Sequence, residues 1–331
     1  MKEKKWWISP APEKNNTKTD KNFVMKNHRF LIAAALMLFA AGCSKPDSPT
    51  TKPGTDKPEP ETPVSPAEMT VTLGQFTANG GGECSFGPLW AEDDAVIVYS
   101  DAEKSGVRYV VKTIKSSTVA VLKLESETSA ALGDGPYYVA WPASAKPSYS
   151  GSKVTFSTVS VQQGRDGKPL RSSLFAAGCS KSTDVTVYPL CSVVNIGLYG
   201  KETVSSIVFS AGTSGVSGKI EASFDEAGKP VVKNALTKSS SIVLNTGETV
   251  LGETPTNFAV VIPAADYTSG MEFMIKTAGE YMLPVKMDAL NAESGVSYDA
   301  GHFDVTAEEP APDPADEKGN EGYGHHTGEW K

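Results

Sequence analysis

Few residues of this chain have the types and spacing that acid–base or nucleophilic chemistry requires. His302 is the only histidine between residues 69 and 306, so a Ser/His/Asp or Cys/His site would have to use it. On a strand, His302 and Asp304 would share one face, but no G-x-S-x-G motif accompanies them. We therefore expect a hydrogen-bonded histidine at a strand edge, in a protein that is not an enzyme.

The acidic and histidine clusters of the sequence lack the ligand patterns of metal sites. Glu92-Asp93-Asp94 lacks the glycine and the spaced acids of a calcium loop and is typical of a solvated turn. His325-His326 stands without carboxylate or thiol neighbours. The cysteines beyond residue 43 form no C-x-x-C pair, and sequence alone leaves their pairing open: Cys84, Cys179 and Cys191. The sequence predicts no metal and no cofactor.

The fourth cysteine, Cys43, has a more definite chemistry. A basic stretch, Met25–Arg29, precedes the apolar run Phe30–Ala40, which is too short to span a bilayer as a helix and ends in small residues before Cys43. This order resembles a bacterial lipoprotein signal, which implies cleavage before Cys43 and acylation of its thiol. A buried helix with a core cysteine fits the basic start and the proline-rich continuation less well. We expect residues 1–42 to be an over-called start plus a signal peptide, with Met25 as the true initiator.

Residues 38–45 recur letter for letter at residues 174–181, around Cys179. The second copy follows residues 164–171, which are polar and turn-forming, where the first copy follows an apolar run. A lipid-attachment signal acts only behind such an apolar segment. We therefore expect no second lipid on Cys179.

The stretch after the signal, residues 43–67, is predicted to be a lipidated, proline-rich linker. Its prolines lie among Thr, Lys, Asp and Glu, a composition typical of an extended, solvated tether. By resemblance to known sorting rules, Ser44 favours the outer membrane. We expect an outer-membrane lipoprotein, exposed at the cell surface and attached to the membrane by the lipid on Cys43.

The charge balance excludes one class of partner. Acidic residues outnumber basic ones by 39 to 31, and the formal net charge is −8. Nucleic-acid binding needs clustered bases, yet beyond residue 43 the sequence contains only Arg108, Arg165 and Arg171 as arginines. The same balance argues against electrostatic adhesion to anionic lipid. We expect no nucleic-acid partner.

From Met69 onward the pattern predicts strands almost throughout. Met69–Leu73 and Met271–Lys276 alternate apolar and polar residues, as half-buried strands do. The strongest short helix candidate is Ser126–Leu132. Further strands are predicted at Ala95–Tyr99, Val107–Ile114, Val119–Leu124, Tyr137–Trp141, Val154–Val161, Val185–Tyr188, Val193–Leu198, Ile207–Phe209, Val216–Phe224, Ile242–Leu244, Phe258–Ile262, Met282–Val285 and Phe303–Thr306.

Many short strands separated by glycine-rich turns predict an all-β fold of the sandwich type. The chain divides near Pro189 into residues 68–189 and residues 190–306, and each part supplies roughly six to eight strands, enough for one β-sandwich. Residues 307–331 contain prolines, acids and Gly-His-His, and we expect a disordered tail.

Several motifs, in this order and spacing, resemble the fimbrillin family of Bacteroides-type bacteria. Trp90–Tyr99 is similar to the strand that opens these proteins, and Tyr137–Pro142 to a strand end of theirs. The remaining motifs are a glutamine-bearing turn, the start of the second domain and a strand near the end, at Val161–Gln163, Pro189–Val194 and Phe258–Pro263.

The resemblance implies two tandem transthyretin-like (Greek-key) β-sandwich domains in a type V pilus subunit. It also implies partners, other pilus subunits, through donor-strand complementation, a form of β-augmentation. In that family an arginine- or lysine-directed protease removes a first strand and opens a groove for a neighbour's strand. Met69–Phe76 matches this first strand, and its strand-exchange candidates are Met69, Val71 and Leu73.

Two departures from the family pattern favour an accessory, anchor or tip subunit over a stalk subunit. No Lys or Arg lies between Lys57 and Lys104, so no basic residue closely follows the first strand. In addition, Pro310–Lys331 lacks the apolar alternation that a donor strand needs to fill a groove. We expect a subunit that keeps its lipid and its first strand, and that serves pilus assembly or adhesion.

The alternative function is a glycan-binding surface lipoprotein of a polysaccharide-uptake system. Tyr137, Tyr138 and Trp141 form the best aromatic cluster, with Tyr137 and Trp141 on one face of a strand. These two rings are the possible glycan contacts, although large aromatics in a two-sheet core more often serve packing.

Overall fold

Alternation of apolar and polar residues builds β1 (Glu68–Leu73) as a strand with one face on a core. In β1, Met69, Val71 and Leu73 are buried, and the two threonines between them are half-buried. The structure, a computed structural model, describes residues 65–126, 131–165, 167–212, 215–306 and 326–328.

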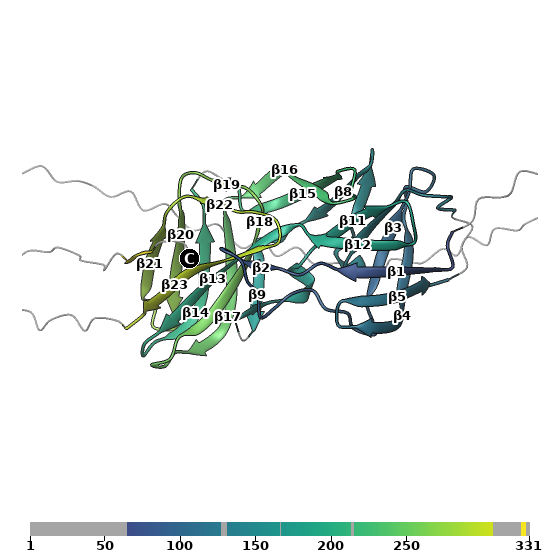
Figure 1. Ribbon diagram of the computed structural model, residues 1–331. Coiled ribbons are helices and arrows are strands. Elements are labelled where there is room, and N and C mark those ends of the chain that lie inside the picture. Colours follow the sequence, from purple (N-terminus) through teal and green to yellow (C-terminus); the bar gives the residue numbers. More distant parts are fainter. Residues whose placement is uncertain (1–64, 127–130, 166, 213–214, 307–325, 329–331) are drawn as a thin grey trace, which may run out of the picture. The chain divides into compact units, whose positions relative to one another are not determined.

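β1 belongs to a sheet that closes on itself, called the closed sheet below. Its hydrogen-bonding order is β1-β12-β11-β6-β3-β4-β5, and β5 pairs back with β1. Figure 1 shows β1 between β5 and β12. The other strands of the closed sheet are β3 (Ala95–Tyr99), β4 (Val107–Ser116), β5 (Val119–Leu124), β6 (Tyr137–Trp141), β11 (Ala176–Ser180) and β12 (Asp184–Pro189).

The other described strands form four further sheets. One has the order β10 (Lys168–Pro169), β9 (Val161–Arg165), β17 (Ser241–Val250), β14 (Thr203–Ser210), β20 (Met271–Thr277), β21 (Met282–Met287) and β24 (His326–Gly328). A second has the order β18 (Thr256–Pro263), β13 (Cys191–Tyr199), β23 (Val296–Asp304) and β2 (Thr77–Ala78). A third contains β16 (Pro230–Ser239), β15 (Ser217–Phe224), β8 (Lys153–Ser157) and β7 (Ser148–Ser150), and β19 (Asp266–Tyr267) pairs with β22 (Leu290–Asn291).

Three clusters of buried apolar side chains fill the described part of the chain. One is centred on the closed sheet, includes the inward side chains of β1 together with Trp141, and extends to Val193 of β13 and Val261 of β18. A second draws only on residues 194–305, among them Ile196, Phe209 and Phe273. The third combines Tyr138 with Ile220 and so joins residues on both sides of position 190.

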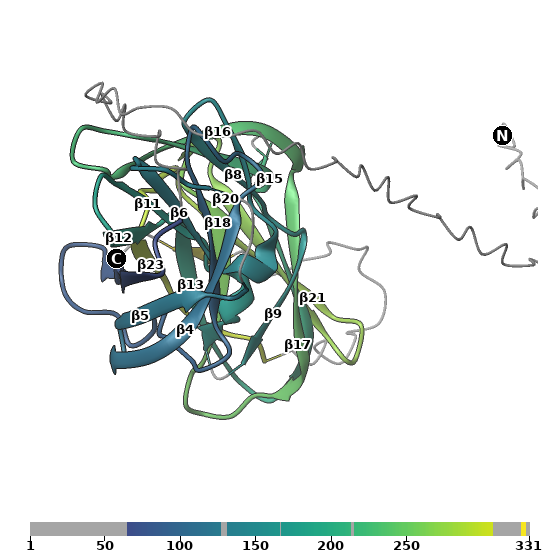
Figure 2. The same ribbon diagram turned by 90° about the vertical axis from the view of Figure 1, so that its right-hand side faces the viewer.

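Hydrogen bonds also cross the predicted domain boundary near Pro189. β8 pairs with β15, and β9 runs parallel to β17, beside which it lies in Figure 2. β2 likewise pairs with β23. The described residues, from residue 65 onward, all belong to one compact unit. The division into a sandwich at 68–189 and another at 190–306 therefore stays a prediction.

The all-β prediction is confirmed. The described helical elements are two short 3-10 turns, η1 (Ala143–Ala145) and η2 (Arg171–Ser173). Most of the predicted helix Ser126–Leu132 lies outside the described residues. Across the part of the chain that the structure describes, no helix has the length and apolarity to span a membrane.

Several stretches differ from the expected strands. Val154–Val161 is not one strand, because β8 and β9 are separate and pair with different sheets. β11 and β16 lie where no strand is predicted, and so do the short strands β2, β7, β10, β19 and β22. Part of the tail predicted to be disordered forms β24, which pairs in parallel with β21. Such a pairing satisfies N–H and C=O groups at the edge of β21. Residues 307–325 lie outside the described residues.

Candidate functional site

The three strand-exchange candidates of β1 all lie in the core of the closed sheet. Met69, Val71 and Leu73 are 1%, 0% and 1% exposed. Val71 lies opposite Val185 of β12 in a parallel pair and opposite Ala120 of β5 in an antiparallel pair. β1 therefore fills a slot between β5 and β12, and we call this the β1 slot.

The β1 slot is stabilised by burial and by backbone pairing on both sides. Burying an apolar side chain of this size contributes about 1.5–3 kcal/mol relative to exposing it. Because β1 has a neighbour on each edge, its removal would also leave two strands with unpaired N–H and C=O groups. The slot suits an extended segment with an apolar residue at every second position.

Residues 74–94, called the connecting segment below, join β1 to β3. The first limb continues along β12, since Gly74 N donates to Val187 O at 2.7 Å. It then reaches β23, where Thr77 N donates to Gly295 O at 2.9 Å. The exposed turn Gly80–Gly82 follows, with positive φ at all three glycines, before the chain returns.

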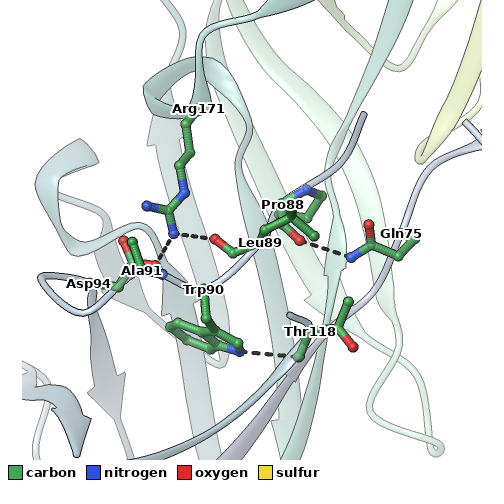
Figure 3. Close-up of polar contacts among 8 residues, drawn as sticks. All are labelled: Gln75, Pro88, Leu89, Trp90, Ala91, Asp94, Thr118 and Arg171. Atoms are coloured by element: carbon green, nitrogen blue, oxygen red, sulfur yellow. Dashed lines mark hydrogen bonds and ion pairs between the residues drawn. The ribbon is translucent and has the colours of Figure 1, made fainter. Parts of the chain in front are cut away.

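The side chain of Gln75 links the two limbs of the connecting segment. Its Nε2 donates to Pro88 O at 2.8 Å, as Figure 3 shows. The same Nε2 donates to Leu73 O at 3.1 Å. A Cβ on Gly87 would come within 2.2 Å of Gln75 Oε1, so the glycine leaves room for the amide. The rings of Phe76 and Phe86 lie 5.8 Å apart on the same two limbs.

Trp90 fixes the returning limb to the turn between β4 and β5. Its Nε1 donates to Thr118 O at 3.1 Å, and its backbone N donates to Ser117 O at 2.8 Å. Leu73 N of β1 donates to the same carbonyl, Thr118 O, at 2.8 Å. The end of β1 and the end of the connecting segment therefore share one anchoring turn.

Arg171, in η2, holds the returning limb from the opposite side. Its guanidinium Nη2 donates to Leu89 O and forms an ion pair with Asp94, as Figure 3 shows. The guanidinium also lies over the ring of Trp141, 5.3 Å from its centroid. Burial lowers the pKa of Arg171, and the charge of Asp93 opposes that shift. Asp94 additionally accepts from Ala91 N at 2.9 Å, which closes the turn at residues 91–94.

The possible glycan contacts, Tyr137 and Trp141, are brought together in the core of the closed sheet. They are 6% and 0% exposed, and the Tyr137 hydroxyl donates to Gly133 O at 2.7 Å. A sugar stacks on an open aromatic face, and neither ring offers one in this conformation. The glycan-binding alternative thus gains no support from this pair.

His302 and Asp304 both lie on β23 and are exposed, with different surroundings. The His302 ring lies over Gly197, where an added Cβ would come 2.2 Å from its Cδ2. It lines an open cleft of about 410 Å³ together with Asn195 and Asn257. Asp304 accepts from the backbone N of Thr306 at 2.8 Å and from its hydroxyl at 2.6 Å.

The three described cysteines are free thiols. Burial raises the pKa of Cys179 to about 11 and that of Cys191 to about 12, and it also raises the pKa of Cys84. A thiol protonated at neutral pH is a poor nucleophile. Cys179, in the second copy of the lipid-signal letters, sits in β11 opposite Tyr138 of β6.

Other predicted site residues fall partly outside the described part of the chain. The lipid-attachment residue Cys43 and the histidine His325 lie outside it. Among the described residues, no group of three or more His, Cys, Asp or Glu side chains could hold a metal ion.

Sequence analysis missed the residues that secure the connecting segment: Gln75, Thr118 and Arg171. Trp90 begins the Trp90–Tyr99 motif, but nothing in the spacing of residues indicates its hydrogen bond to residue 118. The resemblance implies a glutamine-bearing turn at Val161–Gln163, but these residues lie in strand β9, and Gln162 has a definite role there. Its buried amide donates to Val261 O at 2.6 Å and accepts from Val261 N at 2.9 Å, which satisfies the outer edge of β18.

Comparison with known proteins gives structural likeness alone. No family model matches the sequence, and no curated protein matches it. A Bacteroides ovatus protein assigned to cell adhesion is similar, with 14% identity and a TM-score of 0.46, over 76% of this chain and 95% of that one. The tip fimbrial protein Mfa3 of Porphyromonas gingivalis, truncated at its C-terminus, has 9% identity and a TM-score of 0.30, over 71% and 94%. A fimbrial protein of Bacteroides ovatus has 9% identity and a TM-score of 0.36, over 71% and 49%.

Proposed function

We propose that this protein is a non-enzymatic surface lipoprotein that serves pilus assembly or adhesion as an accessory, anchor or tip subunit. The lipid on Cys43 attaches it to the outer membrane. Its partners are other pilus subunits, which in the family it resembles assemble by strand exchange at the slot of the first strand. Because it keeps its own first strand, it does not accept a neighbour's strand as a stalk subunit does.

The observation that carries this proposal is the state of β1. The strand is paired on both sides, its three apolar side chains are buried, and the connecting segment after it has no Lys or Arg. A slot of this shape is the kind that strand exchange uses in the family the sequence resembles. The missing basic residues support retention of β1 in this subunit.

Mass spectrometry of the native N-terminus tests the proposal. Protein isolated from the outer membrane of its own cells is expected to begin at an acylated Cys43 and to continue unbroken through β1. A native N-terminus beyond residue 76 would identify a processed stalk subunit and overturn the proposal. An SDS-resistant ladder of this protein in sheared surface material would do the same.

The duplicated letters around Cys43 and Cys179 supply a matched control for the lipid. Cys43→Ser is expected to move the protein from the membrane fraction to the soluble fraction, because the acylated thiol is lost. Cys179→Ser, which changes the same letter in the second copy, is expected to leave membrane attachment intact. Membrane attachment that survives Cys43→Ser would contradict lipidation at this residue.

A further inference from the structure

The two limbs of the connecting segment are secured to the closed sheet independently of the turn that joins them. On the first limb, Gly74 N donates to Val187 O of β12 at 2.7 Å, and Asn79 N donates to Ser297 O of β23, in a neighbouring sheet, at 2.8 Å. On the returning limb, Trp90 binds the β4–β5 turn and Arg171 binds Leu89. Between the limbs run the Gln75–Pro88 hydrogen bond and the Phe76–Phe86 contact.

The turn at the tip, by contrast, is exposed and has open space beside its three glycines. A Cβ added at Gly80, Gly81 or Gly82 would find no atom within 4 Å. The hydrogen bonds at this tip are local, from Gly81 N to Ala78 O and from Ala78 N to Gly82 O. A cut here therefore breaks only the tip and leaves both limbs bound.

We propose that these contacts form a clasp, made by Gln75, Phe76, Phe86, Gly87 and Trp90, that retains β1 even when the connecting segment is cut. The inference rests on the proposed function, because a permanently filled slot is what a subunit that accepts no partner strand needs. β1 is then retained by the contacts of the clasp as well as by the absence of a protease site.

The clasp works through the position of Pro88. Trp90 and Arg171 hold the returning limb in place, so Pro88 O stays where the Gln75 amide can reach it. After a cut, an outside strand entering the slot would have to displace β1 together with the Gln75 and Phe76 contacts. These contacts lie at the C-terminal end of β1, where separation of a cut strand would otherwise begin, because chain ends fray first.

The experiment cuts the connecting segment and asks whether β1 leaves. A recognition sequence for a site-specific protease is inserted between Gly81 and Gly82 of the full chain, and the protein is cleaved under native conditions. Size-exclusion chromatography then shows whether the N-terminal fragment stays bound. A fluorescent synthetic peptide of residues 65–79, added in excess, reports exchange at the slot. Retention of the fragment and no peptide uptake over one day are expected for the cut wild-type protein.

Two variants loosen the clasp without touching the buried face of β1. Gln75→Ala with Trp90→Phe removes two donors, and Gly87→Ala displaces the Gln75 amide by the volume of one methyl group. A total loss of about 1.4 kcal/mol from the hydrogen bonds of these two donors corresponds to about tenfold faster peptide exchange. Gln163→Ala, at an exposed glutamine outside the clasp, is the matched control and is expected to exchange like the wild type.

Equal exchange rates in the cut wild-type protein and the cut clasp variants would overturn the proposal, whether both rates are fast or slow. Circular dichroism before cleavage confirms that each variant is folded.

Failure of the clasp is also distinguishable from failure of the proposed function. A processed N-terminus in native material overturns the function even if the cut recombinant protein keeps β1, whereas rapid loss of the fragment in vitro overturns the clasp even if native Cys43 is intact.

Discussion

Two glutamines, Gln75 and Gln162, each bind the backbone of a distant segment, and the difference between them shows how this fold separates permanent contacts from adjustable ones. Gln162 is 5% exposed and uses both ends of its amide on one residue, Val261. Gln75 is exposed, and its Nε2 is shared between Leu73 O and Pro88 O. Buried polar groups are costly to leave unpaired, whereas exposed ones can bond to water instead.

The two regions are therefore stabilised in different ways. At β9, a single buried amide secures the edge of β18 and has no substitute. Around the connecting segment, retention is spread over β1 burial, Trp90 and Gln75, in decreasing order of burial. Mutations of these residues are therefore expected to lower the free energy of unfolding by amounts that decrease as burial decreases.

The largest effect is expected in β1 itself. Leu73→Ala should lower the free energy of unfolding by about 2–5 kcal/mol, because it removes a buried side chain and leaves a cavity in the closed sheet. Thr72→Ala, on the half-buried opposite face of the same strand, is the control and should cost less than about 1 kcal/mol. Urea denaturation followed by tryptophan fluorescence measures both. Equal effects of the two changes would contradict the assignment of the buried face.

Gln162→Ala is expected to come next, at about 2–4 kcal/mol. The N–H and the C=O of Val261 both lose their partner in a buried setting, and each unsatisfied group costs about 1–3 kcal/mol. The neighbouring Gln163→Ala, at an exposed position, should stay within about 0.5 kcal/mol. Paired urea titrations of the two variants decide the matter, and a small effect of Gln162→Ala would remove the contrast with Gln75.

Much of the fold follows from local pattern, as β1 illustrates. Its alternation of Met69, Val71 and Leu73 with threonines predicts both the strand and its buried face. Other strands are predicted less well where the pattern is interrupted. In β23 the pairing with β13 shifts between Asn195 and Gly197, so an extra residue changes which side chains face inward. Period-2 alternation therefore finds only the end of that strand.

The parts that sequence could not predict depend on partners far along the chain. β16 lies at the edge of its sheet and pairs there with β15 alone. An edge strand needs little alternation of apolar and polar residues, and Pro230–Ser239 shows no clear alternation. The contacts that secure the connecting segment are similar, since Trp90 and Thr118 are 28 residues apart and Asp94 and Arg171 are 77 apart. No spacing rule relates such residues until the sheet has closed.

A smaller effect is expected at Trp90. Trp90→Phe keeps a buried aromatic ring and removes the Nε1 donor, so it should lower the free energy of unfolding by about 1 kcal/mol. Thr118 O still accepts from Leu73 N, which limits the loss. Hydrogen exchange of the Leu73 and Trp90 amides is the sensitive measurement. Faster exchange confined to this end of β1 is expected, and a global change would show that Trp90 serves the whole core instead.

The smallest effect on stability is expected at Gln75. Gln75→Ala should change the free energy of unfolding by no more than about 0.5 kcal/mol, because water replaces the exposed amide at Leu73 O and Pro88 O. Limited proteolysis at the Gly80–Gly82 turn should nevertheless accelerate, since the two limbs lose their direct link and the tip opens more often. Unfolding titrations and proteolysis rates on the same sample separate these two quantities. A stability loss as large as that of Gln162→Ala would mean that Gln75 is a permanent contact, and the distinction between the two glutamines would fail.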